Sequence, residues 1–154
     1  MLVDRFGRPV KGLRVSLTPS CDLNCFFCHK EGSDAGSDAL MTPEEIERVV
    51  RVAMSFGVDS VKLTGGEPMM RSDILEIVER LGRLKLRDFS MTTNGFRLAE
   101  LAENLRRLGL KRVNISLHST KPERYARITG LSLEEAERRH GKLVEAIRKA
   151  ARVG

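Results

Sequence analysis

All three cysteines of this 154-residue sequence lie within eight positions, as Cys21, Cys25 and Cys28. In a reducing compartment, clustered thiols are more often metal ligands or reactive groups than disulfide partners. Zinc would take a fourth ligand, for which His29 is the obvious candidate, but adjacent residues are awkward tetrahedral partners on one ion. Three thiolates on one loop can hold three corners of an iron-sulfur cube and leave the fourth iron open. The spacing therefore favours a [4Fe-4S] cluster over zinc or plain reactive thiols.

Four short stretches that alternate polar and apolar residues predict the strands of the sheet that positions this loop. They are expected at residues 13–18, 60–64, 89–93 and 112–117. Helical patterns follow the first three strands, and a fourth closes the chain. Such an alternation is typical of an α/β fold with a parallel sheet. We therefore expect four parallel βα units around one core.

The predicted helices are marked by their first residues. Thr42-Pro43-Glu44-Glu45 has a capping threonine, a proline at the first position and a glutamate at the third. Ser72 is expected to cap a second helix, and a third carries the leucines between 98 and 108. Ser132 and Glu135 predict a last helix that ends near Val153, after a stretch that we interpret as a loop. Glycines 57, 82 and 109 are expected just beyond helix ends.

One face of each predicted strand is polar, which is unusual for parallel strands. The polar positions are Arg14, Ser16, Thr18, Ser60, Lys62, Thr64, Ser90, Thr92, Asn94, Asn114, Ser116 and His118. The apolar face must receive the helices, so the polar face should line a wet or ligand-filled concavity. A solvated face on an open sheet is the alternative. The two cations, Arg14 and Lys62, favour a cavity for a ligand with negative charge.

Chemistry in βα proteins gathers at the carboxyl ends of the strands, because the loops there share one mouth. The cysteine motif follows the first predicted strand. Gly65-Gly66-Glu67-Pro68 follows the second, and Asn94-Gly95 follows the third. All three signals should therefore meet at one end of the sheet.

Composition excludes several classes of protein. The net charge is +6, but the basic residues are scattered among glutamates and only 5% of residues are aromatic, so we expect no nucleic-acid partner. No apolar run is long enough for a membrane span, and the first residues lack a signal-peptide pattern, so we expect no membrane partner and a cytoplasmic location.

The motif Cys21-x-x-x-Cys25-x-Phe27-Cys28 after a first strand, with Gly65-Gly66-Glu67-Pro68 after a second, resembles the radical S-adenosylmethionine (radical SAM) superfamily. The resemblance implies a partial radical SAM (βα) barrel, four parallel βα units of an expected six. It also implies that SAM binds the open iron of a [4Fe-4S] cluster and is reduced there to a 5′-deoxyadenosyl radical. The Gly65-Gly66-Glu67 stretch would hold the methionyl amino group.

Longer stretches, including "VKLTGGEPMMRSDI" and "LGLKRVNISLHS", are similar to the GTP 3′,8-cyclase family, which begins molybdenum cofactor synthesis. The similarity implies GTP as substrate and an electron donor as partner. Its residue assignments comprise cluster ligands Cys21, Cys25 and Cys28; SAM contacts Phe27, Gly66, Glu67 and Ser116; and GTP contacts Arg14, Lys62 and Thr92. Family members carry two further strands and a second cluster. We therefore expect residues 1–154 to be a radical SAM core domain that is incomplete at its C-terminus.

The function predicted from this resemblance is radical SAM cyclisation of GTP. The alternatives are another radical SAM enzyme and a non-catalytic fragment that binds a metal through its three cysteines. A partial barrel leaves an open sheet edge, so a homodimer or a companion chain that supplies the missing part is the expected assembly. Residues 32–38 are expected to form a loop beside the cluster.

Overall fold

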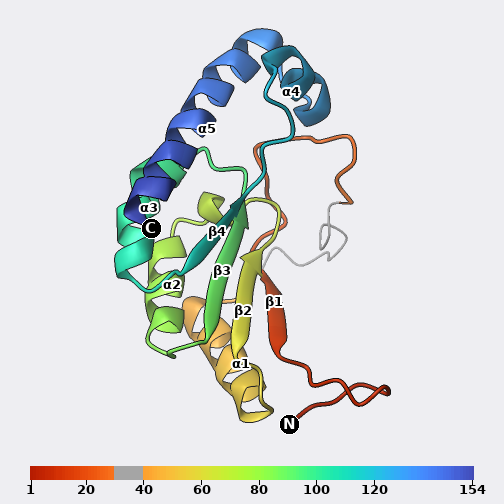
Figure 1. The fold of residues 1–154 in the computed structure, drawn as a ribbon, viewed down its shortest axis with the longest axis vertical. Helices are drawn as coiled ribbons and strands as arrows, with labels where there is room; N and C mark the ends of the chain where they lie inside the picture. Colours follow the sequence, from red (N-terminus) through yellow and green to blue (C-terminus); the bar gives the residue numbers. More distant parts are fainter. Residues whose placement is uncertain (30–39) are drawn as a thin grey trace.

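A four-stranded parallel sheet forms the centre of the computed structural model, which describes residues 1–29 and 40–154 (Figure 1). Its strands are β1 (Gly12–Ser16), β2 (Ser60–Thr64), β3 (Asp88–Thr93) and β4 (Arg112–Ile115), and they lie in sequence order. The predicted α/β class and the four parallel units are confirmed. The predicted loop at 32–38 lies outside the described residues.

Three helices cover one face of the sheet: α1 (Pro43–Ser55), α2 (Ile74–Gly82) and α3 (Leu98–Arg107) (Figure 1). The predicted cap of α1 is present, because the Thr42 hydroxyl accepts the Glu45 N–H and the Glu45 carboxylate accepts the Thr42 N–H. The prediction for Ser72 was wrong. A short 3₁₀ turn, η1 (Pro68–Met70), comes first, and Asp73 precedes α2 without a side-chain cap.

Two helices follow β4, where the sequence had predicted one helix and a loop. The additional helix is α4 (Pro122–Thr129), which begins at a proline and ends at Gly130 in the left-handed conformation. Sequence reasoning missed it because its eight residues carry few apolar side chains. The long helix α5 (Leu133–Val153) begins at Ser132 as predicted. It packs against α4 with its first half and against α3 with its second half (Figure 1).

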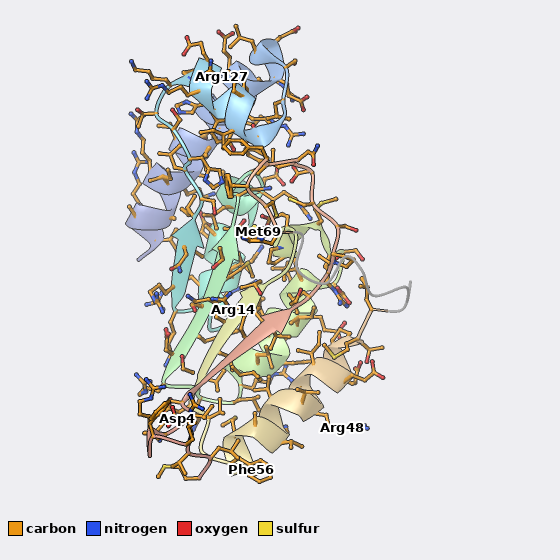
Figure 2. All side chains as sticks on the ribbon, turned by 90° about the vertical axis from the view of Figure 1, so that its right-hand side faces the viewer. Asp4, Arg14, Arg48, Phe56, Met69 and Arg127 are labelled. Carbon is orange, nitrogen blue, oxygen red and sulfur yellow. The ribbon has the colours of Figure 1, made fainter. Side chains whose placement is uncertain are left out.

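The main core lies between the sheet and α1, α2 and α3. Val61, Leu63, Phe89 and Met91 are fully buried on the helix-facing side of the central strands. The opposite face of the sheet has no covering helix among the described residues, and Figure 2 looks toward this face, on which Arg14 is labelled. A smaller core under α4 and α5 contains Tyr125 and Leu143.

Several predicted boundaries differ from the structure. β1 and β4 end at Ser16 and Ile115, two residues earlier than predicted, and β1 and β3 each begin one residue earlier than predicted, at Gly12 and Asp88. Gly82 is the last residue of α2, where an added Cβ would lie 1.9 Å from the Leu108 carbonyl oxygen. Its role is therefore the close approach of two chain segments. No helix among the described residues is long and apolar enough to cross a membrane.

Candidate cluster-binding site

The three cysteines line one cavity at the carboxyl end of the sheet. Its volume is about 300 Å³. Gly65 and Gly66, which follow β2, form part of its wall together with the cysteine loop, defined here as residues 19–29; the lining residues are Pro19, Cys21, Leu23, Asn24, Cys25, Cys28, Gly65 and Gly66. The cysteine motif and the glycine motif thus meet in space. Their nearest lining residues, Cys28 and Gly65, are 37 positions apart in the sequence.

Glycines after β2 allow the start of the cysteine loop to lie directly against that strand end. The Gly66 N–H donates to the Thr18 carbonyl (2.7 Å), and the Glu67 N–H donates to the Ser20 carbonyl (2.8 Å). A Cβ at Gly66 would lie 2.3 Å from the Ser20 oxygen, and Gly65 has a φ of +142°. Only glycine at both positions is compatible with this approach.

Glu67 is buried and connects the end of β2 to the end of β3. One carboxylate oxygen accepts the Thr93 hydroxyl (2.8 Å) and the Met69 N–H (3.0 Å), and the other accepts the Asn94 N–H (2.7 Å). Burial raises the pKa of Glu67, and these three hydrogen bonds oppose that rise. Through these hydrogen bonds the Glu67 side chain holds two strand ends in place. Glu67 does not line the cavity among the described residues.

The far side of the cysteine loop is held by α4. The Asn24 N–H donates to the Thr129 carbonyl (3.0 Å), and the Phe26 N–H donates to the Ile128 carbonyl (3.1 Å). Gly130 ends α4 close to Asn24, with 3.0 Å between an added Cβ and the Asn24 oxygen. The helix that sequence reasoning missed is therefore a direct support of the candidate site.

Asp22 connects the cysteine loop to both β3 and α5. Its carboxylate accepts the side-chain amide of Asn94 (2.7 Å) and the guanidinium of Arg139 (2.7 Å). Arg139 also lies over the Phe96 ring, 4.7 Å from its centroid. Asp22 and Arg139 were not predicted as functional residues. The adjacency of Asp22 to Cys21 was the available signal, whereas nothing in the sequence indicated that Arg139 reaches this loop.

The electrostatics of the thiols suit a cationic partner. Burial raises the pKa of Cys21 and of Cys25, and the neighbouring thiolates raise the pKa of Cys25 further. In residues 1–29 and 40–154, no three Cys, His, Asp or Glu side chains converge closely enough to hold a single ion. Thiols spread around a cavity fit a multi-iron cluster, whose positive irons would relieve the repulsion between thiolates.

The three predicted GTP contacts lie on the uncovered face of the sheet. Arg14 and Lys62 are paired in register across β1 and β2, and Lys62 is paired with Ser90 on β3. Thr92 lies two residues after Ser90 on the same face of β3, closer to the carboxyl end, and is paired with Asn114. The structure thus brings two cations and a hydroxyl to one face. Their contact with GTP stays a prediction.

Two predicted SAM contacts do not line the cavity among the described residues. Phe27 is exposed and packs its ring against His118, with 4.9 Å between ring centroids. Ser116 follows β4 and donates its N–H to the Thr93 carbonyl (2.9 Å). Phe27 belongs to the cysteine loop, whereas Ser116 follows β4, the strand at the other edge of the described sheet from β1. Their roles also stay predictions.

Comparison with known proteins decides the family. The sequence profile of the Radical SAM superfamily matches residues 15–154. The chain belongs to this superfamily. A protein of Thermococcus kodakarensis named probable GTP 3′,8-cyclase is 60% identical over 136 residues, which are 88% of this chain and 44% of that protein. One of the same name from Pyrococcus horikoshii is 50% identical over 153 residues, 99% of this radical SAM chain and 47% of the relative.

Solved structures of radical SAM fold resemble this chain at low sequence identity. Streptococcus suis SuiB, bound to its precursor peptide SuiA, has a TM-score of 0.69 and 22% identity, over 93% of this chain and 30% of SuiB. Methylornithine synthase has a TM-score of 0.69 and 19% identity, over 96% of this chain and 43% of the synthase. These similarities confirm the predicted partial barrel. This radical SAM chain spans less than half the length of the curated relatives it matches.

Proposed function

We propose that this chain forms the part of a GTP 3′,8-cyclase that holds a [4Fe-4S] cluster and SAM, in the first step of molybdenum cofactor synthesis. The observation that carries the proposal is the cavity lined jointly by Cys21, Cys25, Cys28 and the Gly65-Gly66 backbone. The relatives at 46–60% identity that are named probable GTP 3′,8-cyclase support the choice of reaction.

Each part of the cavity has a separate task in this proposal. The thiolates of Cys21, Cys25 and Cys28 hold three corners of the cluster, which when bound supplies the electron for cleavage of SAM. The Gly66 backbone can approach the methionyl group of SAM closely because no Cβ intervenes. Phe27, from the cysteine loop, and Ser116, from the segment after β4, would contact SAM. Glu67 holds the ends of β2 and β3 in the geometry that this contact needs.

GTP would occupy the uncovered face of the sheet. Arg14 and Lys62 are adjacent in register and can neutralise a triphosphate, for which Arg offers planar donors and Lys a compact charge. Thr92 supplies a hydroxyl further toward the strand ends. The ribose would then lie on the side of the cluster, where hydrogen abstraction must take place.

The complete reaction would require more than this chain. Residues 1–154 span under half the length of the relatives, so cyclisation would need additional structure from a longer protein, a companion chain or a second copy. β1 and β4 are the two outer strands of the described sheet and offer edges for such structure. An external electron donor completes the set of partners.

Anaerobic reconstitution followed by iron and sulfide analysis tests the cluster. We expect about four irons and four sulfides per chain, with brown absorbance that is lost in Cys25→Ala. His29→Ala is the matched control, because a cluster on three cysteines does not need His29 whereas a zinc site on the same loop would. Full iron and sulfide in Cys25→Ala, or zinc that disappears with His29→Ala, would contradict the assignment.

Equilibrium binding tests the GTP face. Lys62→Ala and Arg14→Ala should each weaken GTP binding by about 1–3 kcal/mol, the range for a hydrogen bond to a charged group, and leave SAM binding unchanged. Arg48→Ala removes an exposed cation from α1, on the helix side, and should change neither affinity. Equal losses of GTP and SAM affinity would indicate damage to the fold and refute the assignment.

Product analysis separates the two chemical steps. With dithionite as reductant, the chain alone should release 5′-deoxyadenosine slowly and make no cyclised GTP. Without the additional structure GTP would not be held in place, and a 1 Å misplacement of substrate can cost about 100-fold in rate. Anaerobic chromatography measures both products. Normal cyclisation by residues 1–154 alone would contradict the need for additional structure.

A further inference from the structure

A row of polar side chains crosses all four strands on the uncovered face of the sheet, where Arg14 is labelled in Figure 2. The residues paired in register are Arg14 with Lys62, Lys62 with Ser90, and Ser90 with Arg112. Residues paired in this way share one face, at the strand spacing of about 4.8 Å. We call these four residues the cation row. It adds Ser90 and Arg112 to two of the predicted GTP contacts.

The cation row carries more positive charge than the described residues neutralise. Arg112 donates to the Asp88 carboxylate (2.7 Å), but neither Arg14 nor Lys62 forms an ion pair with any side chain that the structure describes. Asp88 also accepts the Ser60 hydroxyl (3.3 Å), so this one acidic partner lies at the amino-terminal border of the row. Like charges side by side on neighbouring strands are destabilising, and an anion bound between them would relieve the repulsion.

Ser90 is the only uncharged residue of the cation row, and it is fully buried. Phe89 and Met91, its neighbours in the sequence, are buried in the main core against the helices, so alternation places Ser90 on the opposite, uncovered face. Its hydroxyl has no hydrogen-bond partner among the described residues. A buried hydroxyl without a partner costs free energy, so its presence in a central strand requires an explanation.

The surroundings of the Ser90 hydroxyl are rich in donors and poor in acceptors. The cations that flank it on β2 and β4 can only donate. Asp88 and Thr92, two residues before and after it on the same face, do not hydrogen-bond to it, and the Asp88 carboxylate accepts from the two outer neighbours instead. A phosphate held between Lys62 and Arg112 would accept from both cations and from this hydroxyl. Because Ser90 is buried, a phosphate reaches it only when the long side chains on either side turn to bind the anion.

The cation row lies deeper along the strands than the third predicted GTP contact. Thr92 follows Ser90 by two residues, a rise of about 6.6 Å toward the carboxyl ends. The cysteine cavity is at those ends. A nucleotide whose ribose lies on the side of the cluster would therefore direct its outer phosphates, β and γ, toward the row.

We propose that Ser90 and Arg112 bind the outer phosphates of the nucleotide, together with Arg14 and Lys62, and so select a nucleoside triphosphate. The Ser90 hydroxyl donates to a phosphate oxygen. The Arg112 guanidinium has five N–H donors, of which one contacts Asp88 and one contacts Asn114, so donors remain for a phosphate. This inference rests on the proposed function and names the part of the substrate that the deep end of the face reads.

Calorimetric titration of the 154-residue chain with GTP, GMP, inorganic triphosphate and SAM tests the inference. Ser90→Ala and Arg112→Ala should each weaken binding of GTP and inorganic triphosphate by about 10- to 150-fold, the loss of a hydrogen bond to a charged group. Binding of GMP and SAM should stay unchanged. Arg83→Ala is the matched control for charge, because Arg83 is also exposed and ion-paired, to Glu79, but lies at the end of α2 on the helix side, and it should change no affinity.

Urea unfolding separates phosphate binding by Ser90 from a purely structural role. Removal of a buried hydroxyl that has no partner should leave Ser90→Ala at least as stable as the unmodified chain, although it binds GTP more weakly. A fall in stability that accompanies equal losses of GTP, GMP and SAM affinity would show that Ser90 only supports the fold, and would overturn its role.

The outcomes separate this inference from the proposed function. Undiminished binding of GTP and inorganic triphosphate by Ser90→Ala or Arg112→Ala would overturn the new contacts and leave the rest of the GTP face intact. Binding of inorganic triphosphate that depends on both residues, without competition by GTP, would support the cation row and overturn the choice of GTP. If the unmodified chain binds neither GTP nor inorganic triphosphate, both proposals for this face are overturned, whereas the iron analysis still decides the cluster.

Discussion

Substitution of Gly66 by alanine should displace the cysteine loop, because the new methyl group has no space. Its Cβ would lie 2.3 Å from the Ser20 oxygen and 2.7 Å from the Pro19 oxygen, and Cβ atoms essentially never approach within 3.0 Å. The two segments must therefore separate by at least about 0.7 Å. Both neighbours are backbone atoms, so rotation of a side chain cannot relieve the contact.

The cost can be estimated from what this separation breaks. The Gly66-to-Thr18 and Glu67-to-Ser20 hydrogen bonds would both lengthen, at about 0.5–1.5 kcal/mol each. Overpacking adds about 1–3 kcal/mol. We expect Gly66→Ala to lower the free energy of unfolding by about 2–6 kcal/mol. We also expect the variant to bind SAM more weakly, because a displacement near 1 Å moves the cysteine loop away from the glycine segment that forms the other wall of the cavity.

Urea denaturation and SAM binding measure these effects. Gly141→Ala is the matched control, because Gly141 lies in α5 with nothing within 4 Å of its added Cβ. This change should stabilise the protein by about 0.5–1 kcal/mol, the helix preference of alanine over glycine. If Gly66→Ala is as stable as the unmodified chain and binds SAM normally, the reasoning about the strand end is refuted.

Two further changes test ion pairs, one at the cysteine loop and one just before α2. Arg139→Gln should lower the free energy of unfolding by about 1–3 kcal/mol and loosen iron retention, because it removes the ion pair with Asp22; exposed Arg138→Gln should change stability by less than about 0.5 kcal/mol in the same urea experiment. The Arg71 guanidinium holds the pKa of Asp73 below its usual value, so this pair stabilises the fold above about pH 4 and its contribution is lost as the pH falls through the folded pKa. Unfolding measured from pH 5 to pH 2 should therefore show a shallower acid slope in Asp73→Asn, and identical slopes would contradict this account.

The sheet and the cysteine cavity could be predicted because their signals are local. Alternation of apolar residues located four strands, and a parallel sheet brings its carboxyl ends together, so Cys21 and Gly66 were expected at one mouth. Thr42 and Ser132 located two helix starts correctly because capping is a property of a few adjacent residues.

The supports of the cavity could not be predicted in the same way. Arg139 contacts Asp22 across 117 positions. It also pairs with Glu135 at i−4, a spacing that is typical of a solvated helix surface. α4 is short and polar, and only its contact with the loop shows its purpose. The unpartnered hydroxyl of Ser90 is visible only when the burial of every neighbour is known.

The supports of the cysteine loop become available in a fixed order during synthesis. Gly66 can pair with the loop once β2 exists, and Asn94 follows when β3 is made, 72 positions after Asp22. Thr129 and Arg139 come later still, with α4 and α5. Because distant contacts require the closure of long chain segments, the cysteines are made early but become rigidly placed late. If the loop holds the proposed cluster, iron and sulfide delivered before α4 and α5 are made would meet a pliable loop.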